Sequence, residues 1–157
     1  MSFESAQAWL AEHAPDIRII DQGRSTATVA EAAEALGVEP ARIAKTLALR
    51  VGERVLLLVA RGDARLDNAK TKAAFGGRPR MLDPDETLAR TGHAVGGVCP
   101  FGLAEPLPVY CDVSLRAFDT IFPAAGSRTS SVEVAPARLA ELVAGEWVDL
   151  CTVPEAP

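Results

Sequence analysis

The stretch AKTLALRVGERVLLLVA, residues 44–60, is the part of the sequence that decides the fold. Aliphatic residues fill both halves of the stretch, and Gly52-Glu53 separates the halves. Two such runs joined by a glycine-containing pair are typical of neighbouring strands. Glycine at the first central position suits a type II′ turn, whose twist matches that of the flanking strands. The sequence therefore predicts a β-hairpin over these residues.

Helices and shorter strands are predicted on both sides of the hairpin. Thr28 and Glu31 form a capping box, and Gly37 stands where a helix ends. The predicted helices span residues 3–13, 28–37, 67–75, 84–90 and 136–143, and the other predicted strands lie within residues 17–20, 107–115, 131–134 and 147–151. Helices that alternate irregularly with strands, one hairpin among them, indicate a mixed α/β (α+β) domain around a mixed sheet. No repeat or linker divides the chain, so residues 1–157 are predicted to form a single domain.

The composition narrows the class of protein. Hydrophobic residues make up 48% of the sequence and charged residues 24%, which is ordinary for a folded soluble domain. No apolar run approaches the ~20 residues that span a bilayer, and the acidic first segment does not resemble a signal peptide, so we expect a cytoplasmic protein without membrane contact. The cysteines, Cys99, Cys111 and Cys151, have no disulfide or zinc spacing. Two distant histidines and scattered carboxylates also predict no metal site.

Charge is distributed unevenly along the sequence, whose net charge is −5. Residues 42–90 carry eleven Lys and Arg against six acidic residues, whereas the rest of the chain carries five against fifteen. One interpretation is a solvated surface whose charges happen to be segregated. The other is that the basic middle segment faces a polyanion such as a nucleic acid.

Lys45 is a candidate functional residue, one of only three lysines beside thirteen arginines. Because side chains alternate along a strand, Lys45 should share a face with Leu47, Leu49 and Val51. Its ammonium group would then lie at the edge of an apolar pocket and could bind a carbonyl or phosphate oxygen. The competing interpretation is a lysine at a strand end that extends into solvent.

The second candidate is the loop GHAVGGVCPFGLAEPLP, residues 92–108, which is apolar like a core but rich in glycine and proline. Glycine lets a backbone approach a ligand closely, and its N–H groups can hold an oxyanion. The competing interpretation is a loop packed on the core. Cys99 within it could be a thiol nucleophile with His93 as its base, although a free cysteine is more often an apolar filler. Gly126, in the segment FPAAGSRTSSVEV at 122–134, suggests a further tight turn.

In this order, these pieces resemble the YbaK/ProX family of aminoacyl-tRNA deacylases, relatives of the editing domain of prolyl-tRNA synthetases. The resemblance rests on TVAEAAEALG at 28–37, IAKTL at 43–47, RLD at 65–67 and GGVCPFG at 96–102, followed by an Ala-Gly turn before VEV. It extends over about residues 20–150. The resemblance implies a compact domain with a partly barrel-like mixed sheet surrounded by helices.

The resemblance also implies a function, the hydrolysis of the ester that joins a wrong small amino acid to transfer RNA, commonly proline tRNA. Prolyl-tRNA synthetase is a possible partner, and no DNA, metal or organic cofactor is implied. Lys45 matches the family lysine. The implied substrate-binding residues are Thr26, Gly96, Gly97, Val98, Cys99, Pro100 and Gly126. Ala124 stands where some members have serine, so the edited amino acid stays open among Ala, Ser, Cys, Thr and small non-protein amino acids.

Two other functions stay open at this point. A non-catalytic module on the same fold would bind tRNA or a synthetase, more weakly as salt increases, without turnover. A thiol-dependent hydrolase would need Cys99 as its nucleophile.

Overall fold

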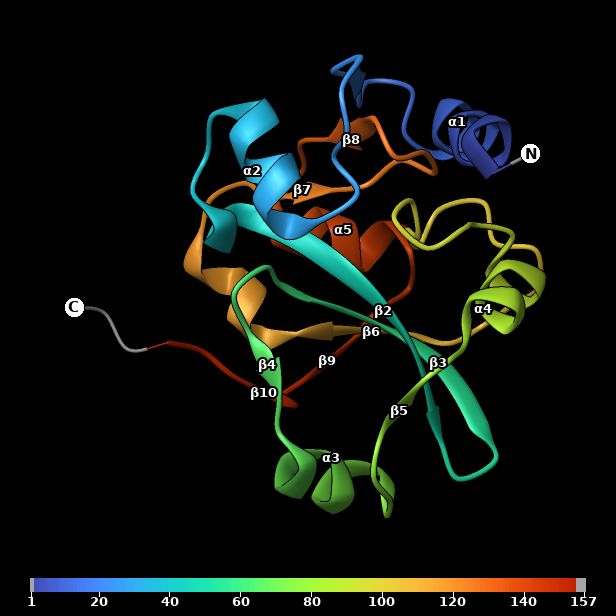
Figure 1. Ribbon diagram of the computed structural model, residues 1–157, viewed down its shortest axis with the longest axis vertical. Coiled ribbons are helices and arrows are strands. Elements are labelled where there is room, and N and C mark those ends of the chain that lie inside the picture. The colour runs from blue at the N-terminus through green and yellow to red at the C-terminus, as the bar shows by residue number, and fades with distance from the viewer. Residues whose placement is uncertain (1, 155–157) are drawn as a thin grey trace.

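The predicted hairpin lies at the centre of the sheet (Figure 1). The structure, a computed structural model, describes residues 2–154. Strands β2 (Ile43–Val51) and β3 (Arg54–Arg61) pair in antiparallel fashion along their whole length. Gly52 between them has a φ of 61°, the positive value that the first central position of a type II′ turn requires. The hairpin prediction is confirmed.

A mixed sheet extends from this hairpin in the order β5-β2-β3-β6-β9. β2 pairs with β5 in antiparallel and with β7 in parallel fashion, and parallel pairs join β3 to β6 and β6 to β9. The added strands are β5 (Arg80–Met81), β6 (Val109–Asp112), β7 (Phe122–Pro123) and β9 (Glu146–Val148). The path of paired strands ends at β5 and β9, so the sheet is open rather than barrel-like. The predicted mixed sheet is confirmed.

Two small antiparallel pairs complete the strands, β1 with β8 and β4 with β10. Their bounds are β1 (Ile19–Asp21), β8 (Ser130–Val132), β4 (Arg65–Leu66) and β10 (Cys151–Thr152). The single strand predicted within 147–151 is therefore wrong. Leu150 separates β9 from β10, because its N–H donates to Asp112 Oδ1 at 2.8 Å and its carbonyl accepts from Asp67 N–H at 2.8 Å.

The helices form where their capping residues predict them. Thr28 Oγ1 accepts from Glu31 N–H at 3.1 Å, and Gly37 ends that helix with a φ of 70°. Asp67 and Asp83 cap the next two helices in the same way. The helices are α1 (Ser2–His13), α2 (Val29–Leu36), α3 (Asn68–Phe75), α4 (Pro84–Thr91) and α5 (Pro136–Leu142), with 3-10 turns at Pro40–Arg42 and Val113–Ala117. None within residues 2–154 has the length and hydrophobicity to cross a bilayer.

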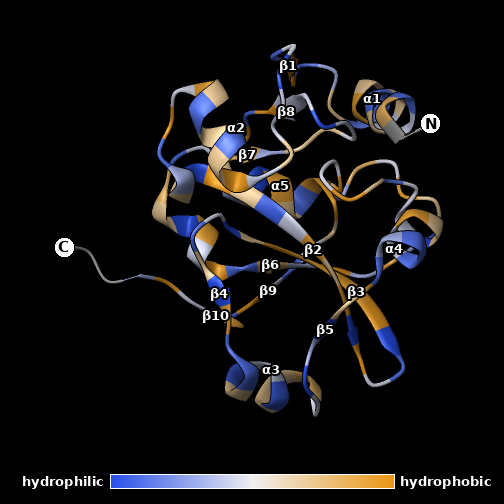
Figure 2. Ribbon diagram, viewed as in Figure 1, coloured by the Kyte–Doolittle hydropathy of each residue, from blue (hydrophilic) through white to orange (hydrophobic). Residues whose placement is uncertain are grey.

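The hairpin carries core residues on both faces, because successive side chains of a strand point to opposite sides. Ala44 and Ala48 of β2 belong to a large cluster that also contains Phe101, whereas Leu49 belongs to a second cluster with Leu150. Figure 2 shows β3 as hydrophobic along most of its length. The hairpin therefore separates two packed layers and supplies a rigid wall for a site beside β2.

Candidate active site

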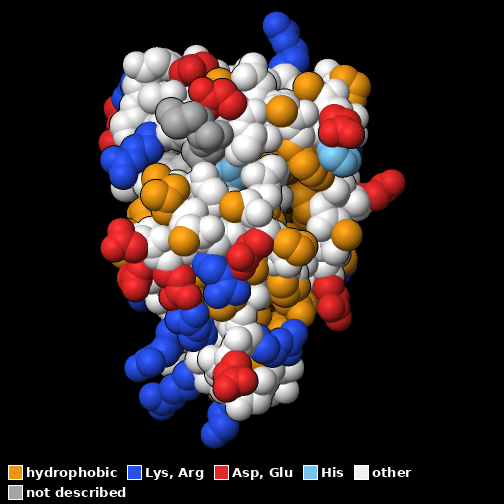
Figure 3. All heavy atoms as spheres, turned by 90° about the vertical axis from the view of Figure 1, so that its right-hand side faces the viewer, with side chains coloured by type: hydrophobic (Ala, Val, Ile, Leu, Met, Phe, Trp, Pro, Cys, Tyr) orange, Lys and Arg blue, Asp and Glu red, His pale blue; other side chains and the backbone are white. Residues whose placement is uncertain are grey.

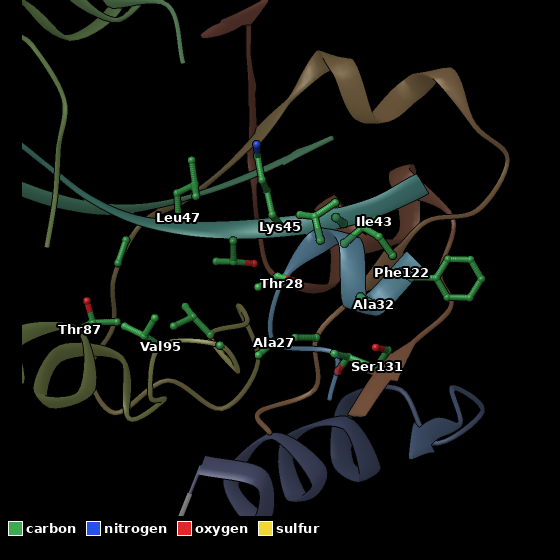
Figure 4. Close-up of a pocket in the computed structure, with 18 of the residues that line it drawn as sticks. Ala27, Thr28, Ala32, Ile43, Lys45, Leu47, Thr87, Val95, Phe122 and Ser131 are labelled. Carbon is green, nitrogen blue, oxygen red and sulfur yellow. The ribbon is translucent and has the colours of Figure 1, made fainter. Parts of the chain in front are cut away.

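A cavity of about 250 Å³ lies beside β2. Its walls come from β2, the segment leading into α2, the glycine-rich loop and the β7–β8 region (Figure 4). Four of the predicted site residues line it, namely Thr26, Lys45, Gly96 and Val98. The structure thus brings the lysine strand and the glycine-rich loop to one cavity.

The lining combines alanines and larger apolar residues with hydroxyl residues. Its alanines are Ala27, Ala32, Ala44, Ala48 and Ala124, and its hydroxyl residues are Thr26, Thr28, Thr46, Thr87 and Ser131. Among the residues that the structure describes, Lys45 is the one charged residue of the lining, which has no carboxylate. Such a cavity suits a small ligand and offers no carboxylate as a general base.

Lys45 shares a face of β2 with Leu47, as the alternation predicted. Figure 4 shows both side chains pointing to the side of β2 opposite Ala27, Val95 and Ser131. The structure therefore does not turn the ammonium group toward the glycine-rich loop. The ammonium lies across β2 from these three lining residues, where Gly62 and Ala64 supply its hydrogen-bond acceptors.

The ammonium group of Lys45 is held by two backbone carbonyls. Nζ donates to Gly62 O at 3.2 Å and to Ala64 O. An ammonium has three donors, so one N–H remains for a ligand. Burial lowers the pKa of Lys45, and the nearby Asp63 carboxylate opposes that shift. Lys45 is thus a fixed, half-buried cation rather than a mobile surface lysine.

Thr46 is a lining residue that was not predicted from the sequence. It follows Lys45 on β2, so its side chain points to the opposite face of the strand, where the alanines of the cavity wall lie. Its Oγ1 atom is buried and has no hydrogen-bond partner within residues 2–154. A buried hydroxyl without a partner costs about 1–3 kcal/mol. Strand alternation beside Lys45 was the signal that would have identified it.

The glycines of the loop are required by close packing. Gly96 has a φ of 96°, and a Cβ there would lie 3.1 Å from Arg128 Nε. A Cβ on Gly97 would lie 3.1 Å from the backbone of Ser127. The double glycine therefore lets the loop pack directly against the turn that contains Gly126.

The backbone N–H groups of the loop differ in availability. Gly97 N–H donates to Ala94 O at 2.9 Å, closing a turn, so it is not a free donor for an oxyanion. The N–H groups of Gly96 and Val98 have no acceptor within residues 2–154. Both residues line the cavity, which leaves these two as the candidate oxyanion donors.

Thr26 and Gly126 both lie close to Arg128, but only Thr26 lines the cavity. Thr26 is buried, and its N–H and Oγ1 donate to Arg128 O at 2.6 and 3.1 Å. Gly126 has a φ of 90° and lies with Gly97 at a neighbouring hollow rather than at the cavity. Thr26 therefore lines the cavity, but its N–H and its hydroxyl already donate to Arg128 O.

Cys99 and Pro100 are buried and lie outside the cavity lining, Cys99 in the core and Pro100 at a separate hollow that Trp9 of α1 also lines. Cys99 is fully buried, with Sγ 3.6 Å from His93 Nε2. Burial raises the pKa of the Cys99 thiol to about 12 and lowers the pKa of His93. His93 Nε2 is also 2.7 Å from Phe101 O. A protonated, enclosed thiol is a poor nucleophile, so the geometry favours the apolar-filler interpretation.

Metal ligands do not gather in the described part of the chain. Within residues 2–154 no three side chains of His, Cys, Asp and Glu are grouped so that they could hold a metal ion.

Comparisons with known proteins place this architecture among editing domains. YwhH of Bacillus subtilis, which is uncharacterised, is 46% identical over 153 residues, covering 96% of this chain and 98% of YwhH. EbsC of Enterococcus faecalis, named as a candidate Cys-tRNA(Pro)/Cys-tRNA(Cys) deacylase, is 32% identical over 76% of this chain and 74% of its own length. The proline–tRNA ligase of Shouchella clausii is 34% identical over 82% of this chain, a segment that is 22% of that ligase.

Solved structures agree with the sequence relatives. The crystal structure of a candidate trans-editing enzyme for prolyl tRNA synthetase superposes with a TM-score of 0.88 at 31% identity, covering 96% of this chain and 97% of that chain. Residues 24–142 match the aminoacyl-tRNA editing domain, a span that includes the whole cavity lining. The chain therefore belongs to the aminoacyl-tRNA editing domain family.

Proposed function

We propose that this protein is a free-standing deacylase that hydrolyses the ester of a small amino acid wrongly joined to tRNA, with proline tRNA as its substrate. The observation that carries the proposal is the cavity, which is small, free of carboxylates among its described lining residues and bounded by Lys45 and two free backbone N–H groups. An aminoacyl ester is already activated, so the site has only to position water, stabilise an oxyanion and hold the tRNA end.

The geometry supports separate tasks for the groups on the two sides of β2. The N–H groups of Gly96 and Val98 donate hydrogen bonds to the ester carbonyl oxygen as negative charge develops on it. Lys45, on the far side of β2, uses its remaining N–H to hold an oxygen of the terminal nucleotide, its phosphate above all. Water attacks the carbonyl carbon, and the ester breaks to release the amino acid and the free terminal hydroxyl of the tRNA. A neighbouring ribose hydroxyl assists the water, in place of a general base from the protein.

The choice of substrate follows from the size of the cavity and from its relatives. Alanines on several walls admit a small side chain, and Ala124 removes the hydroxyl that a serine would present. Apolar walls discriminate by only about 1–3 kcal/mol per methylene, so several small amino acids compete. Proline tRNA and prolyl-tRNA synthetase are proposed because a segment of the Shouchella clausii proline–tRNA ligase resembles this chain. The site of action is then the cytoplasm, where tRNA is charged.

Catalytic turnover distinguishes the proposed deacylase from a non-catalytic module that only binds tRNA or a synthetase. The test is to incubate catalytic amounts of protein with mischarged proline tRNA and to measure the released amino acid. We expect many ester bonds cleaved per protein molecule. Saturable tRNA binding with no release above the buffer rate would establish the binding module instead.

Cys99→Ala is expected to leave kcat/KM for deacylation within about 2-fold of wild type, because the thiol is enclosed and protonated. The small cavity left in the core should lower the free energy of unfolding by about 1 kcal/mol. Single-turnover kinetics measures the deacylation activity, and thermal denaturation measures the change in the free energy of unfolding. A 100-fold loss of activity in a folded variant would reinstate the thiol nucleophile.

Thr46→Val is expected to lower kcat/KM about 10-fold, the effect of one lost hydrogen bond to the bound amino acid or its ester. The same change removes a buried, unpartnered hydroxyl, so the free energy of unfolding should stay constant or rise by about 1 kcal/mol. Thr87→Val is the matched control on the same cavity, because the Thr87 hydroxyl donates to Leu82 O at 3.4 Å. Equal activity of Thr46→Val and wild type would show that the substrate does not contact this hydroxyl.

A further inference from the structure

The Val95–Gly96 peptide of the glycine-rich loop is the central unit of a tight turn. Gly97 N–H donates to Ala94 O at 2.9 Å, which closes a four-residue turn. Gly96 has a φ of 96°, whereas the φ of Val95 is not positive. A negative φ at the first central position and a positive φ at the second define a type II turn, which favours glycine at the second.

A type II turn differs from a type I turn mainly in the direction of this central peptide. In the type I form, the φ of the second central residue is about −90° instead of about +80°, and the ψ of the first is about −30° instead of about +120°. Together these two changes rotate the central peptide by roughly 180° and leave the ends of the turn in place. Glycine adopts both values of φ readily. The Val95 carbonyl and the Gly96 N–H can therefore exchange sides without unfolding of the loop.

Arg128 contacts the carbonyl of this peptide. Its Nε donates to Val95 O at 3.2 Å, and a Cβ on Gly96 would lie 3.1 Å from that Nε and 3.2 Å from Arg128 Cγ. The main chain of Arg128 is fixed as well, because its carbonyl accepts from the N–H and the hydroxyl of Thr26 at 2.6 and 3.1 Å. Arg128 thus connects the turn to the segment that leads into α2, on another wall of the cavity.

The contact with Val95 O sets the direction of the Gly96 N–H. No peptide bond within residues 2–154 is cis, and in a trans peptide the N–H points opposite to the C=O. The Gly96 N–H therefore points away from Arg128, which lies outside the cavity lining to which Gly96 belongs. In the flipped form the carbonyl would take the place of the N–H and would repel negative charge on a substrate oxygen. Only the type II form supplies the donor.

The surroundings of Arg128 favour a contact within the protein. Arg128 forms no ion pair within residues 2–154, so no carboxylate there competes with Val95 O for its guanidinium. Figure 3 shows Lys and Arg side chains gathered at the lower end of the face that carries α1 and α4. Arg128 lies two residues before β8, which Figure 1 places at the upper end. It therefore stands apart from that group of cations.

We propose that Arg128 is a positioning residue that keeps the Val95–Gly96 peptide in the type II form, with the Gly96 N–H turned toward the ester carbonyl. This inference rests on the proposed function, which supplies the ester. Arg128 acts through the loop and does not touch the reacting atoms. Its loss lowers the fraction of molecules that offer the donor, and the rate of cleavage falls with that fraction, whereas tRNA binding does not change.

The test compares two uncharged replacements of similar length, Arg128→Gln and Arg128→Met. The side-chain nitrogen of glutamine follows three carbons, as Nε of arginine does, so Arg128→Gln keeps a donor for Val95 O without the charge. Methionine has no donor. We expect kcat on mischarged tRNA to fall about 10-fold in Arg128→Met and to stay within about 3-fold in Arg128→Gln, with KM unchanged in both. The loss is smaller than the ~100-fold or more for a deleted oxyanion donor, because part of the population keeps the type II form.

Arg18→Met is the control, because it removes an exposed arginine outside the cavity lining and should change neither constant. Equal losses in Arg128→Gln and Arg128→Met, accompanied by a raised KM, would overturn the inference and assign Arg128 to a phosphate of the tRNA. Wild-type kcat in Arg128→Met would also overturn it, since the loop would then hold its own direction.

A second measurement does not depend on turnover. The NMR residual dipolar coupling of the Gly96 N–H reports the direction of that bond in the folded protein. We expect the coupling to be the same in wild type and Arg128→Gln and to change in Arg128→Met, while the couplings of β2 and β3 stay constant. An unchanged Gly96 coupling in Arg128→Met would overturn the inference. If wild type cleaves no ester, the proposed function fails, and the coupling still decides whether Arg128 holds this peptide.

Discussion

Replacement of Lys45 by alanine is expected to lower kcat/KM for aminoacyl-tRNA deacylation by about 100-fold or more. Lys45 is the charged residue of the described cavity lining, and two carbonyls hold its ammonium group in place. A cation fixed in a half-buried site interacts more strongly with a substrate oxygen than a mobile one in water. The measurement is single-turnover release of the amino acid from mischarged tRNA.

Lys70→Ala is the matched control for Lys45→Ala. The Lys70 ammonium also has two oxygen partners, Asp149 Oδ1 and Cys151 O, both at 2.9 Å, but it lies outside the cavity lining. We expect that variant to keep deacylation within about 2-fold of wild type, since exposed ion pairs contribute little. A folded Lys45→Ala protein with the same rate as Lys70→Ala would remove Lys45 from the mechanism.

Gly62→Ala is expected to lower the free energy of unfolding by about 3 kcal/mol, which corresponds to roughly 6–12 °C in Tm. Gly62 follows β3, and a Cβ there would overlap Pro40 O and lie 2.9 Å from Val29 Cγ1 and 3.1 Å from Ile43 O. Backbone atoms on two sides cannot move apart cheaply. Because the Gly62 carbonyl also accepts from Lys45, the displaced backbone should lower activity as well. Thermal and urea denaturation measure the change.

Gly23→Ala separates crowding from backbone strain. Gly23 has a φ of 66°, but no atom lies within 4 Å of an added Cβ. We expect a loss of about 1 kcal/mol there, from the left-handed backbone conformation alone. If Gly62→Ala lost no more than Gly23→Ala, the close contact at the end of β3 would not be a determinant of stability.

Local chemistry explains why much of the fold was predictable. A capping residue and its partner three residues later define a helix start without any tertiary contact, as Thr28 and Glu31 do. Gly52 likewise defines the turn between β2 and β3 without a tertiary contact, because glycine readily adopts the positive φ that this turn requires. The split between β9 and β10 was not predictable, because it depends on Asp112 and Asp67, which are distant in sequence from Leu150.

Part of the cavity lining was predictable from the sequence, since Thr26, Lys45, Gly96 and Val98 line the cavity, but the directions of the polar groups were not. Strand alternation correctly gave the face of Lys45, yet the carbonyls that hold its ammonium come from the turn after β3. The glycine-rich loop was expected to offer its N–H groups, and only tertiary structure shows that Gly97 uses its own to close a turn. Thr46 belongs to the IAKTL stretch, but the sequence does not show that its hydroxyl is buried without a partner, because tertiary contacts determine that.

The most direct test of the account is the release of Ala, Ser, Cys and Thr, each labelled and each esterified to proline tRNA, under single-turnover conditions. The account predicts that wild type releases at least one of them at least 100-fold faster than buffer does, and that Lys45→Ala, while folded, abolishes that release. If none of the esters is cleaved faster than in buffer, the cavity beside β2 is not a deacylase site.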